Sequence, residues 1–323
     1  MREGRLYGRG SYDMKGAVAA FITATKALQD LGITLAGDLA LHVVVDEESG
    51  GHAGTQALIN RGERADAVIV AEPTTGDIHH SEAGLSWVRV TIFGRSDHAG
   101  VRYANIYPQK GGTPIGGGDG INAIEIGMQF IEAVQQLEKD WGRRFVHPLL
   151  PAGITTINPG VIHGGVGLGE DGLPIVRVNP AMIPDTCVID FDFKFMGDFE
   201  ERKQEFEGLI DGMAASHSWL KENRPTLQWN HSSIYFPPID TPLDHPLANM
   251  IRASRSDLGL ETVSTGFPAV TDGAFYAGAG VTPLIYGPNG SGLHGLDEYV
   301  EIDSLLESAK VYAGTILRWC GVA

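Results

Sequence analysis

Five acidic or histidine side chains, spread over most of the chain, have the types and surroundings of a binuclear metal site. They are Asp13 in GRGSYDMKG, Glu47 and Glu48 in VVVDEESGG, Glu72 in VIVAEPT and His294 in GSGLHGLDEYV. Each ends a run that reads as a buried strand, or lies in a glycine-rich turn just beyond one. Carboxylates and a neutral imidazole are the ligands that Zn²⁺ and related hydrolytic ions bind. The set therefore predicts a metal-dependent hydrolase.

Taken one at a time, these residues have ordinary explanations. Asp13 could cap the N-terminus of the helix that follows it. Glu47 and Glu48 could be solvated loop charges, and His294, between two glycines, could be an exposed loop histidine. Adjacent carboxylates repel each other unless a cation lies near, so the Glu47–Glu48 pair makes most sense with one member bound to metal. The metal prediction rests on the joint placement.

The first part of the chain alternates between helix and strand patterns. Residues 17–31 carry apolar side chains at helical spacing, and residues 53–61 predict a second helix. Residues 39–45 (LALHVVV) and 67–71 (AVIVA) are short, wholly apolar runs, which predict strands of a parallel sheet covered on both faces. Ligands of such sheets bind beyond the carboxyl ends of the strands, and the acidic positions lie there in this sequence.

The hydrophobic period changes at about residue 84. Residues 86–94 alternate polar and apolar side chains, as a half-solvated antiparallel strand does. A small α+β sandwich follows, with helices at 121–138 and 199–215 and strands near 154–162, 187–195 and 226–231. After proline-rich residues 236–246 the earlier pattern returns, with a helix at 245–257, a strand at 282–287 and a helix at 303–319.

These patterns predict an α/β fold class in two domains. Residues 1–83 and 237–323 form a catalytic metal-binding domain with a mostly parallel sheet covered by helices. Residues 84–236 form an inserted α+β lid and dimerisation domain.

Composition narrows the class of partner. The 24 Lys and Arg against 40 Asp and Glu give a net charge of −16, which argues against nucleic acid or an anionic membrane as a partner. Cys187 and Cys320 form no CxxC pair and no disulfide framework. The sequence contains neither a signal-peptide pattern at its start nor a membrane-spanning apolar run. We expect a cytoplasmic protein with a small-molecule substrate.

Several motifs together resemble the M20 metallopeptidases, the group that includes acetylornithine deacetylase, succinyl-diaminopimelate desuccinylase, aminoacylase and carboxypeptidase G2. The landmarks occur in the family's order from residue 4 to the C-terminus: GRLYGRGSYDMKG, DEESGG, AEPT, GRSDHAG, GINAI, IPDTC and HGLDEYVEI. The resemblance implies that Asp13 bridges two metal ions, that Glu48 and His294 complete the shell of one, and that Glu72 binds the other. It implies that Glu47 binds no metal and acts as general base and then acid. The expected ions are Zn²⁺, two per complete site, with Co²⁺ as a substitute.

The resemblance also assigns roles in the inserted domain. His98 is similar to the histidine that one subunit of family dimers lends to the neighbouring site to stabilise an oxyanion, with a buried structural histidine as the alternative. Asn179 is expected to point at the substrate. Lys194 stands where the family has an arginine that grips the substrate carboxylate, and a solvent-facing strand lysine is about as well supported. The roles of Asp272 and of glycine-rich residues 108–120, typical of a mobile loop, stay open.

The sequence departs from the family at one metal ligand. The family's first ligand is a histidine in a His-x-Asp motif before the GRG turn, and no histidine of this sequence lies in such a motif. Either the chain is a truncated form of an active enzyme or it is a shorter paralogue that has lost one metal site. We favour truncation, because the other motifs are intact. As written, the ion at Glu72 keeps two carboxylates and binds weakly, so an occupancy of one ion instead of two stays open.

Two functional hypotheses follow. The first is a hydrolase that cleaves the amide bond of an N-acyl amino acid or short peptide with a metal-activated water, as a homodimer through the inserted domain. We expect residues 121–138 and an edge strand at 86–94 to make the dimer contacts. The alternative is a catalytically impaired paralogue or fragment that acts as a dimerising ligand-binding module. Glu47 favours the enzyme, and the missing ligand favours the module. The acyl group depends on loops that the sequence does not place.

Overall fold

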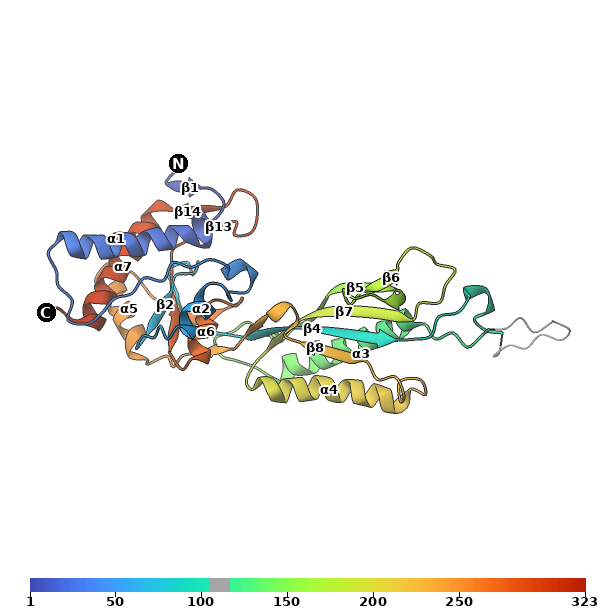
Figure 1. Cartoon of the computed structure of the whole chain (residues 1–323). Helices are drawn as coiled ribbons and strands as arrows, with labels where there is room; N and C mark the ends of the chain where they lie inside the picture. The colour runs from blue at the N-terminus through green and yellow to red at the C-terminus, as the bar shows by residue number, and fades with distance from the viewer. Residues whose placement is uncertain (105–116) are drawn as a thin grey trace. The chain divides into compact units, whose positions relative to one another are not determined.

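The chain folds into two compact units, and the computed structural model describes residues 1–104 and 117–323 (Figure 1). Unit 1 contains Met1–Gly84, His147–Pro151 and Phe236–Ala323, and unit 2 contains Leu85–Val146 and Ala152–Tyr235. Most of the glycine-rich segment 108–120 lies outside the described residues. Within the described ranges, no helix combines the length and the apolar character that a membrane crossing requires.

A mixed sheet forms the centre of unit 1. Its strand order is β10 (Ile239–Asp240), β3 (Ile78–Glu82), β12 (Pro283–Ile285) and β2 (Val68–Val70), and β11 (Ser264–Phe267) also pairs with β3. The β12–β2 and β11–β3 pairs are parallel, whereas the β12–β3 and β10–β3 pairs are antiparallel. The predicted α/β fold class is confirmed, and the sheet that carries it combines both kinds of pair.

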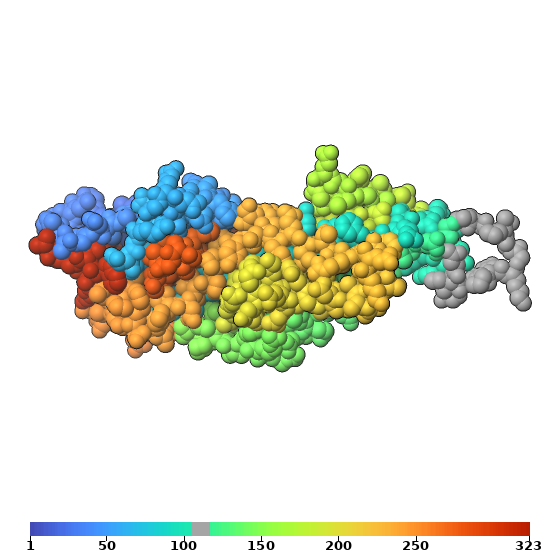
Figure 2. All heavy atoms as spheres, turned by 60° about the horizontal axis from the view of Figure 1, so that its bottom comes forward, coloured from blue at the N-terminus to red at the C-terminus, as the bar shows by residue number. Residues whose placement is uncertain are grey.

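The N-terminal and C-terminal segments of unit 1 lie side by side (Figures 1 and 2). Strand β1 (Arg5–Tyr7) pairs antiparallel with β14 (Tyr299–Glu301), which also pairs with β13 (Gly290–Ser291). Helix α1 (Gly16–Asp30) packs on α7 (Ile302–Cys320), with α5 (Pro246–Ser256) beyond it. The rings of Phe21 and Tyr312 stack with centroids 3.7 Å apart. This pairing brings the turn with Asp13 to the loop with His294.

The prediction of a buried strand at residues 39–45 is wrong. The run lies in no strand, and Leu41, Val43 and Val45 are 37%, 66% and 69% exposed. A strand needs a neighbour for its backbone N–H and C=O groups, and no described strand pairs with this run. His42, within this run, contacts the Tyr276 hydroxyl through Nδ1 at 2.5 Å. Apolar composition indicates what a run can bury, but it does not supply the partner strand.

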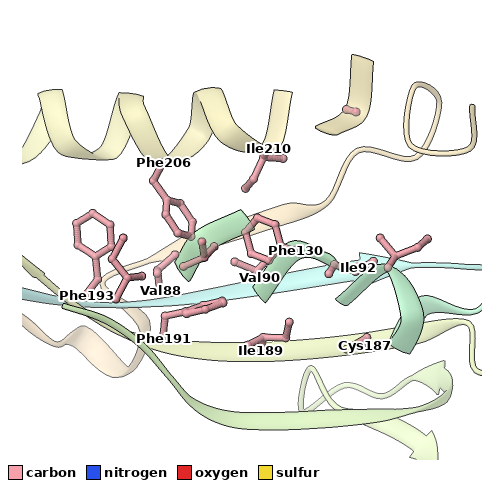
Figure 3. Packing of buried hydrophobic residues seen from close by; sticks show 14 of the residues in the cluster. Val88, Val90, Ile92, Phe130, Cys187, Ile189, Phe191, Phe193, Phe206 and Ile210 are labelled. Carbon is pink, nitrogen blue, oxygen red and sulfur yellow. The ribbon is translucent and has the colours of Figure 1, made fainter. Parts of the chain in front are cut away.

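Unit 2 is a sheet with two helices on one face. The strand order is β6 (Pro174–Val176), β5 (Ile157–Leu168), β7 (Thr186–Phe195), β4 (Gly84–Phe93) and β8 (Thr226–Trp229), and β9 (Tyr235–Phe236) also pairs with β4. Helices α3 (Ala123–Arg144) and α4 (Phe199–Ser216) cover it. Figure 3 shows Phe206 and Ile210 of α4 pointing towards the sheet, where Val88 and Val90 of β4 are fully buried. The alternation of polar and apolar side chains at 86–94 thus reflects a strand with one covered face. Val88 and Val90 point to the helices, and the intervening Trp87 is 39% exposed.

Strand β4 is an internal strand, which contradicts the predicted edge strand at 86–94. Its residues Val88–Thr91 pair with Thr226–Trp229 of β8, and β7 lies on its other side. The long open edge belongs to β5 instead, because β6 pairs with it only at Val166 and Leu168. A four-residue strand such as β8 gives too short a pattern to reveal that it covers β4.

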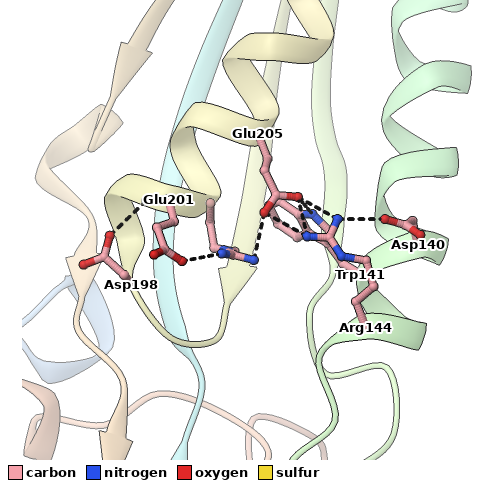
Figure 4. Close-up of polar contacts among 7 residues, drawn as sticks. Asp140, Trp141, Arg144, Asp198, Glu201 and Glu205 are labelled. Atoms are coloured by element: carbon pink, nitrogen blue, oxygen red, sulfur yellow. Dashed lines mark hydrogen bonds and ion pairs between the residues drawn. The ribbon is translucent and has the colours of Figure 1, made fainter.

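A partly exposed network of ion pairs joins α3 to α4 in unit 2 (Figure 4). The Glu205 carboxylate accepts hydrogen bonds from Trp141 Nε1 at 3.0 Å and from Arg144 at 2.8 to 3.0 Å, and it pairs with Arg202 at 2.9 Å. Burial alone raises the pKa of Glu205, but the donors Arg144, Arg202 and Trp141 outweigh it and lower the pKa to about 2.

We predict that Glu205→Gln destabilises unit 2 by roughly 1–3 kcal/mol at neutral pH, because charged hydrogen bonds are lost. The folded pKa lies below the usual value, so the stabilisation is complete above about pH 5 and is lost as pH falls towards 2. Urea unfolding followed by tryptophan fluorescence measures it, because four of the five tryptophans (Trp87, Trp141, Trp219 and Trp229) lie in unit 2. Glu132→Gln, at an exposed position of α3, is the control. A parent–variant difference that is the same at neutral pH and at about pH 3 contradicts the assignment.

Candidate metal centre

Three of the predicted metal ligands converge in unit 1. His294 Nε2 lies 3.0 Å from Asp13 Oδ2 and 3.1 Å from Glu48 Oε2. One ligand atom from each of the three residues lies within 4.8 Å of the other two. Among the described residues, no other three histidine, cysteine, aspartate or glutamate side chains meet this condition. The three residues come from distant parts of the sequence, so the convergence is a property of the fold.

The donor set fits a small divalent cation. Zn²⁺ bonds of 2.0–2.2 Å in a tetrahedron place neighbouring ligand atoms about 3.4 Å apart, close to the two distances at His294. The Glu48 and His294 side chains are 60% and 63% exposed, so an ion can reach them from solvent, whereas Asp13 is 14% exposed. Two carboxylates and one imidazole leave a coordination position for water, as hydrolytic sites require.

Asp13 lies in a turn that the surrounding chain shapes closely. The turn Ser11–Lys15 precedes α1, and the peptide bond between Asp13 and Met14 is cis. The N-cap of α1 is Lys15, and no side chain caps the helix, so the capping alternative for Asp13 is excluded. Tyr12 is buried, and its ring packs so closely on Gly290 that a Cβ there would lie 2.6 Å from it. A glycine at 290 is therefore needed for the turn and the His294 loop to meet.

Glu47 is half-buried beside the three donors and carries a raised pKa. Burial, followed by repulsion from Asp272, Glu48 and Asp13, raises the pKa of Glu47 to about 8. The residue begins the short turn Glu47–Ser49, whose preceding residue Asp46 accepts a hydrogen bond from Ala53 N at 2.9 Å. A carboxylate so placed can take up and release a proton.

Glu72 follows β2 and is buried at 5% exposure, outside the group of three donors. Burial, and then repulsion from Glu47 and Asp13, raises its pKa. Two further acids lie in the same region. The fully buried Glu82, at the end of β3, accepts hydrogen bonds from Thr271 N at 3.3 Å and Thr271 Oγ1 at 3.0 Å. Unit 1 therefore concentrates more carboxylates than one ion requires.

Asp272 is the second of these acids, and its environment favours a role near Glu47. Its Oδ2 accepts a hydrogen bond from Thr55 Oγ1 at 2.6 Å, at the start of α2 (Thr55–Asn60). Its Oδ1 is buried and has no hydrogen-bond partner among the described residues. Burial raises the pKa of Asp272 to about 6 despite the Thr55 bond. Gly51, with φ of +70°, packs against Asp272, so the turn with Glu47 rests on this side chain.

The predicted residues of unit 2 lie at two ends of its sheet. His98 and Met182 form an isolated bridge, and Asn179 accepts a hydrogen bond from Ala181 N, so His98 and Asn179 share one end. Lys194 is the residue before the last of β7, whereas Asp185, which accepts a hydrogen bond from Gly94 N, directly precedes the first. Nine strand residues separate the ends, about 30 Å. His98 is exposed, which excludes the buried structural alternative, and its Nδ1 accepts from Gly100 N at 3.0 Å.

Sequence patterns did not reveal the residues that hold the turn of Asp13. Glu298 and Arg9 both lie inside quoted motifs, but nothing in their spacing shows that they meet. Arg9 Nη1 donates to Glu298 Oε2 at 3.0 Å, and Gly10 N and Asp13 N donate to the same carboxylate. Thr55 and Glu82 lie outside the motifs and carried no signal.

Comparison with known proteins identifies the family. The sequence pattern of peptidase family M20/M25/M40 matches residues 1–318. The chain belongs to this family.

Relatives of the M20 chain cleave amide bonds. This chain is 32% identical over 332 residues to N-formyl-4-amino-5-aminomethyl-2-methylpyrimidine deformylase of Bacillus subtilis. The match covers 99% of this chain and 73% of that protein. This chain is also 28% identical to succinyl-diaminopimelate desuccinylase of Delftia acidovorans, covering 98% and 73%. Aminopeptidase PepT of Bacillus cereus shares the fold, with a TM-score of 0.69 at 17% identity over 98% of this chain and 75% of that one. The M20 chain is a hydrolase by family.

We predict that unit 1 of the metal-free M20 protein is less stable at pH 8 than at about pH 5. A carboxyl group with a raised folded pKa holds its proton more tightly when folded, so stability is highest below the usual pKa of about 4 and is lost as pH rises through the folded value, about 8 for Glu47 and about 6 for Asp272. Hydrogen exchange of α1 and α7 in the presence of a chelator measures it. Added Zn²⁺ should restore more protection at pH 8 than at about pH 5, because protons compete with the ion. Equal or greater metal-free protection at pH 8 contradicts the prediction.

Proposed function

We propose that this protein hydrolyses the amide bond of a small N-acylated amine, such as an N-acyl amino acid or a short peptide, with Zn²⁺ or Co²⁺ as cofactor. The observation that carries the proposal is the convergence of Asp13, Glu48 and His294 beside a half-buried Glu47. The amide-cleaving relatives support the reaction type, and they differ among themselves in the acyl group that they remove.

Each residue has a defined part in this mechanism. Asp13, Glu48 and His294 would hold one ion, and Glu72 with Asp13 would hold a second. Metal bound there would supply polarisation of the acyl oxygen and a lowered pKa of water. Glu47 accepts a proton from the attacking water, whose oxygen forms a bond to the acyl carbon. The C–N bond then breaks, and Glu47 returns the proton to the leaving amine nitrogen. Glu47 lies on a turn that Asp272 and Thr55 support, so its carboxylate is held near the ligands.

A ligand-binding module without catalysis is the second candidate. The observation in its favour is that Glu72 does not join any group of three close donors among the described residues. A carboxylate pair holds a divalent ion weakly compared with a three-ligand set. If the second ion is needed for turnover, the protein would bind substrate and one ion without hydrolysing the amide.

The two ends of the sheet in unit 2 support a role for His98 in a neighbouring subunit. About 30 Å of strand separates His98 and Asn179 from Lys194, so one substrate of small size cannot contact all three in the same unit. We propose that Lys194 binds the substrate carboxylate, and that Asn179 and His98 reach the site of the other protomer in a homodimer. His98 Nδ1 accepts a hydrogen bond, which leaves the proton on Nε2 for donation to an oxyanion.

The open edge of β5 is the contact surface that suits such a dimer. Val161 and Ile162 are 46% and 49% exposed on this strand, and their backbone edge pairs with no other described strand. An exposed apolar edge can pair with its copy about a two-fold axis.

Glu47→Gln should lower kcat by roughly 10²–10⁴-fold while metal content stays unchanged, because the amide cannot take up the proton. Release of amine from N-formyl, N-acetyl and N-succinyl compounds and from dipeptides, with Zn²⁺ or Co²⁺ present, measures activity. Glu63→Gln, at an exposed position of the same unit, is the matched control.

The same assay separates the two candidate functions. A parent protein that carries metal and releases no amine from any substrate supports the binding module. Activity of Glu47→Gln within a few-fold of the parent, at equal metal content, removes Glu47 as the base.

Mixing His98→Ala with Glu47→Gln should restore part of the activity that each variant lacks. After subunit exchange, one site of every hybrid dimer combines an intact base with an intact histidine, so up to about a quarter of the parent activity returns. Subunit exchange is verified by mass spectrometry, and each variant alone is the control. No recovery after verified exchange contradicts the assignment in trans, and monomers only in sedimentation at micromolar concentration contradict the dimer.

A further inference from the structure

One buried carboxylate accepts three backbone hydrogen bonds from the turn that contains Asp13. Glu298 is 3% exposed. Its Oε2 accepts from Gly10 N at 2.9 Å, and its Oε1 accepts from Tyr12 N and Asp13 N, both at 3.0 Å. Successive N–H groups that converge on one point form a nest, which binds an anion. Here the anion is a side chain of the same protein.

Strand pairing delivers this carboxylate to the nest. Tyr7 of β1 lies opposite Tyr299 of β14, and Gly8 N donates to Glu298 O at 2.9 Å just beyond that pair. Gly10, with φ of +78°, turns the chain so that the following N–H groups face Glu298. A Cβ at Gly10 would also approach Lys15 Nζ to 2.9 Å.

Arg9 joins the same carboxylate to the loop of His294. Its Nη1 donates to Glu298 Oε2 at 3.0 Å, and its Nη2 donates to Gly295 O at 2.6 Å. Gly295 follows His294 directly. The guanidinium thus spans the loop between the metal-ligand histidine and Glu298, and it fixes the distance between them.

These contacts close a ring through two of the proposed ligands. The ring runs from His294 Nε2 to Asp13 Oδ2, from Asp13 N to Glu298 Oε1, and along the backbone from Glu298 to His294. Asp13 is held at both its backbone N–H and its carboxylate, so a shift of the His294 loop moves both ends of it together.

We propose that Glu298 is a positioning residue of the metal centre, which holds the Asp13 turn and the His294 loop at the separation that one divalent ion needs. The inference rests on the proposed metal-binding function of Asp13, Glu48 and His294. Glu298 is not one of the proposed metal ligands. It acts through the backbone of Asp13 and, with Arg9, through the loop that carries His294.

Glutamine cannot replace Glu298 in this role. A carboxylate offers two acceptor oxygens, whereas the amide offers one oxygen and an NH₂ group that only donates. In Glu298→Gln the NH₂ group of the side chain would then face a backbone N–H group of the nest, and neither can accept a hydrogen bond. The turn must move or rotate to relieve this, and Asp13 moves with it.

The test is a titration of metal-free protein with Co²⁺ alone, read by its visible absorption bands. Glu298→Gln should weaken Co²⁺ binding by about 10–100-fold, the usual effect of losing an outer hydrogen bond at a metal site, and should alter the band shape. Asp297→Asn is the matched control, because it removes one charge from the adjacent exposed residue, whose side chain forms no hydrogen bond or ion pair among the described residues. Amide exchange of residues 8–14 in the metal-free protein should rise in Glu298→Gln and not in Asp297→Asn.

A second control separates positioning from general stability. Thr241→Val removes a buried hydrogen bond to Pro283 O of 2.6 Å in the same unit, so it lowers the stability of unit 1 without touching the nest. Its Co²⁺ affinity and bands should match those of the parent within about twofold. Equal losses of Co²⁺ affinity in Thr241→Val and Glu298→Gln overturn the proposal.

The remaining outcomes distinguish this inference from the function on which it rests. Failure of the parent to bind Co²⁺ contradicts the metal centre itself. If the parent binds Co²⁺ and the affinity of Glu298→Gln lies within about threefold of it, the positioning role of Glu298 is contradicted and the metal centre is not. If Glu298→Gln does not fold, the Co²⁺ affinity of Arg9→Met tests the proposal instead, because this variant removes the exposed partner of the Arg9–Glu298 ion pair. Weakening of at least about threefold supports the proposal, and an unchanged affinity overturns it.

Discussion

Unit 1 must accommodate six carboxyl groups in one region, where the His294 imidazole contacts Asp13 and Glu48. Burial raises the pKa of five of them, Asp13, Glu47, Glu72, Glu82 and Asp272, and repulsion from neighbouring carboxylates adds to the effect. Without cations such a group is stable only when several members keep their protons. Divalent ions remove the repulsion and convert a cost of folding into binding free energy.

In unit 1 the proposed metal ligands lie on loops and turns, whereas strand pairs and helices position those loops. The ligands lie on turns and loops, which can approach one another, while the β1–β14 pair and the α1–α7 packing hold those loops. Glu298 lies at the junction, where its carboxylate accepts hydrogen bonds from backbone N–H groups of the Asp13 turn. These donors stabilise the negative charge of Glu298 beside the candidate metal centre and lower its pKa.

Hydrophobic periodicity was sufficient to predict long elements with one covered face. The helix expected at 17–31 is Gly16–Asp30, and the one expected at 199–215 is Phe199–Ser216. Hydrophobic periodicity failed where apolar residues are exposed or polar residues are buried. Residues 39–45 are apolar and exposed, because no described strand pairs with them, and Ile78–Glu82 reads IHHSE yet is wholly buried. His80 of that strand contacts Thr241 O through Nδ1 and Ser264 Oγ through Nε2, and no local pattern contains these distant partners. For the candidate site, motif order was enough to nominate Asp13, Glu48 and His294, whereas the part of Glu298 required the turn geometry.

The most direct measurement of the central claim is an anomalous difference map at the zinc edge, from crystals of the protein grown with Zn²⁺. The account predicts a peak between Asp13 Oδ2, Glu48 Oε2 and His294 Nε2, at about 2.0–2.2 Å from each. A weaker peak between Asp13 and Glu72 would mark the second ion. Zinc bound elsewhere in unit 1 with these three side chains still in mutual contact, or no bound zinc at millimolar concentration, would contradict it.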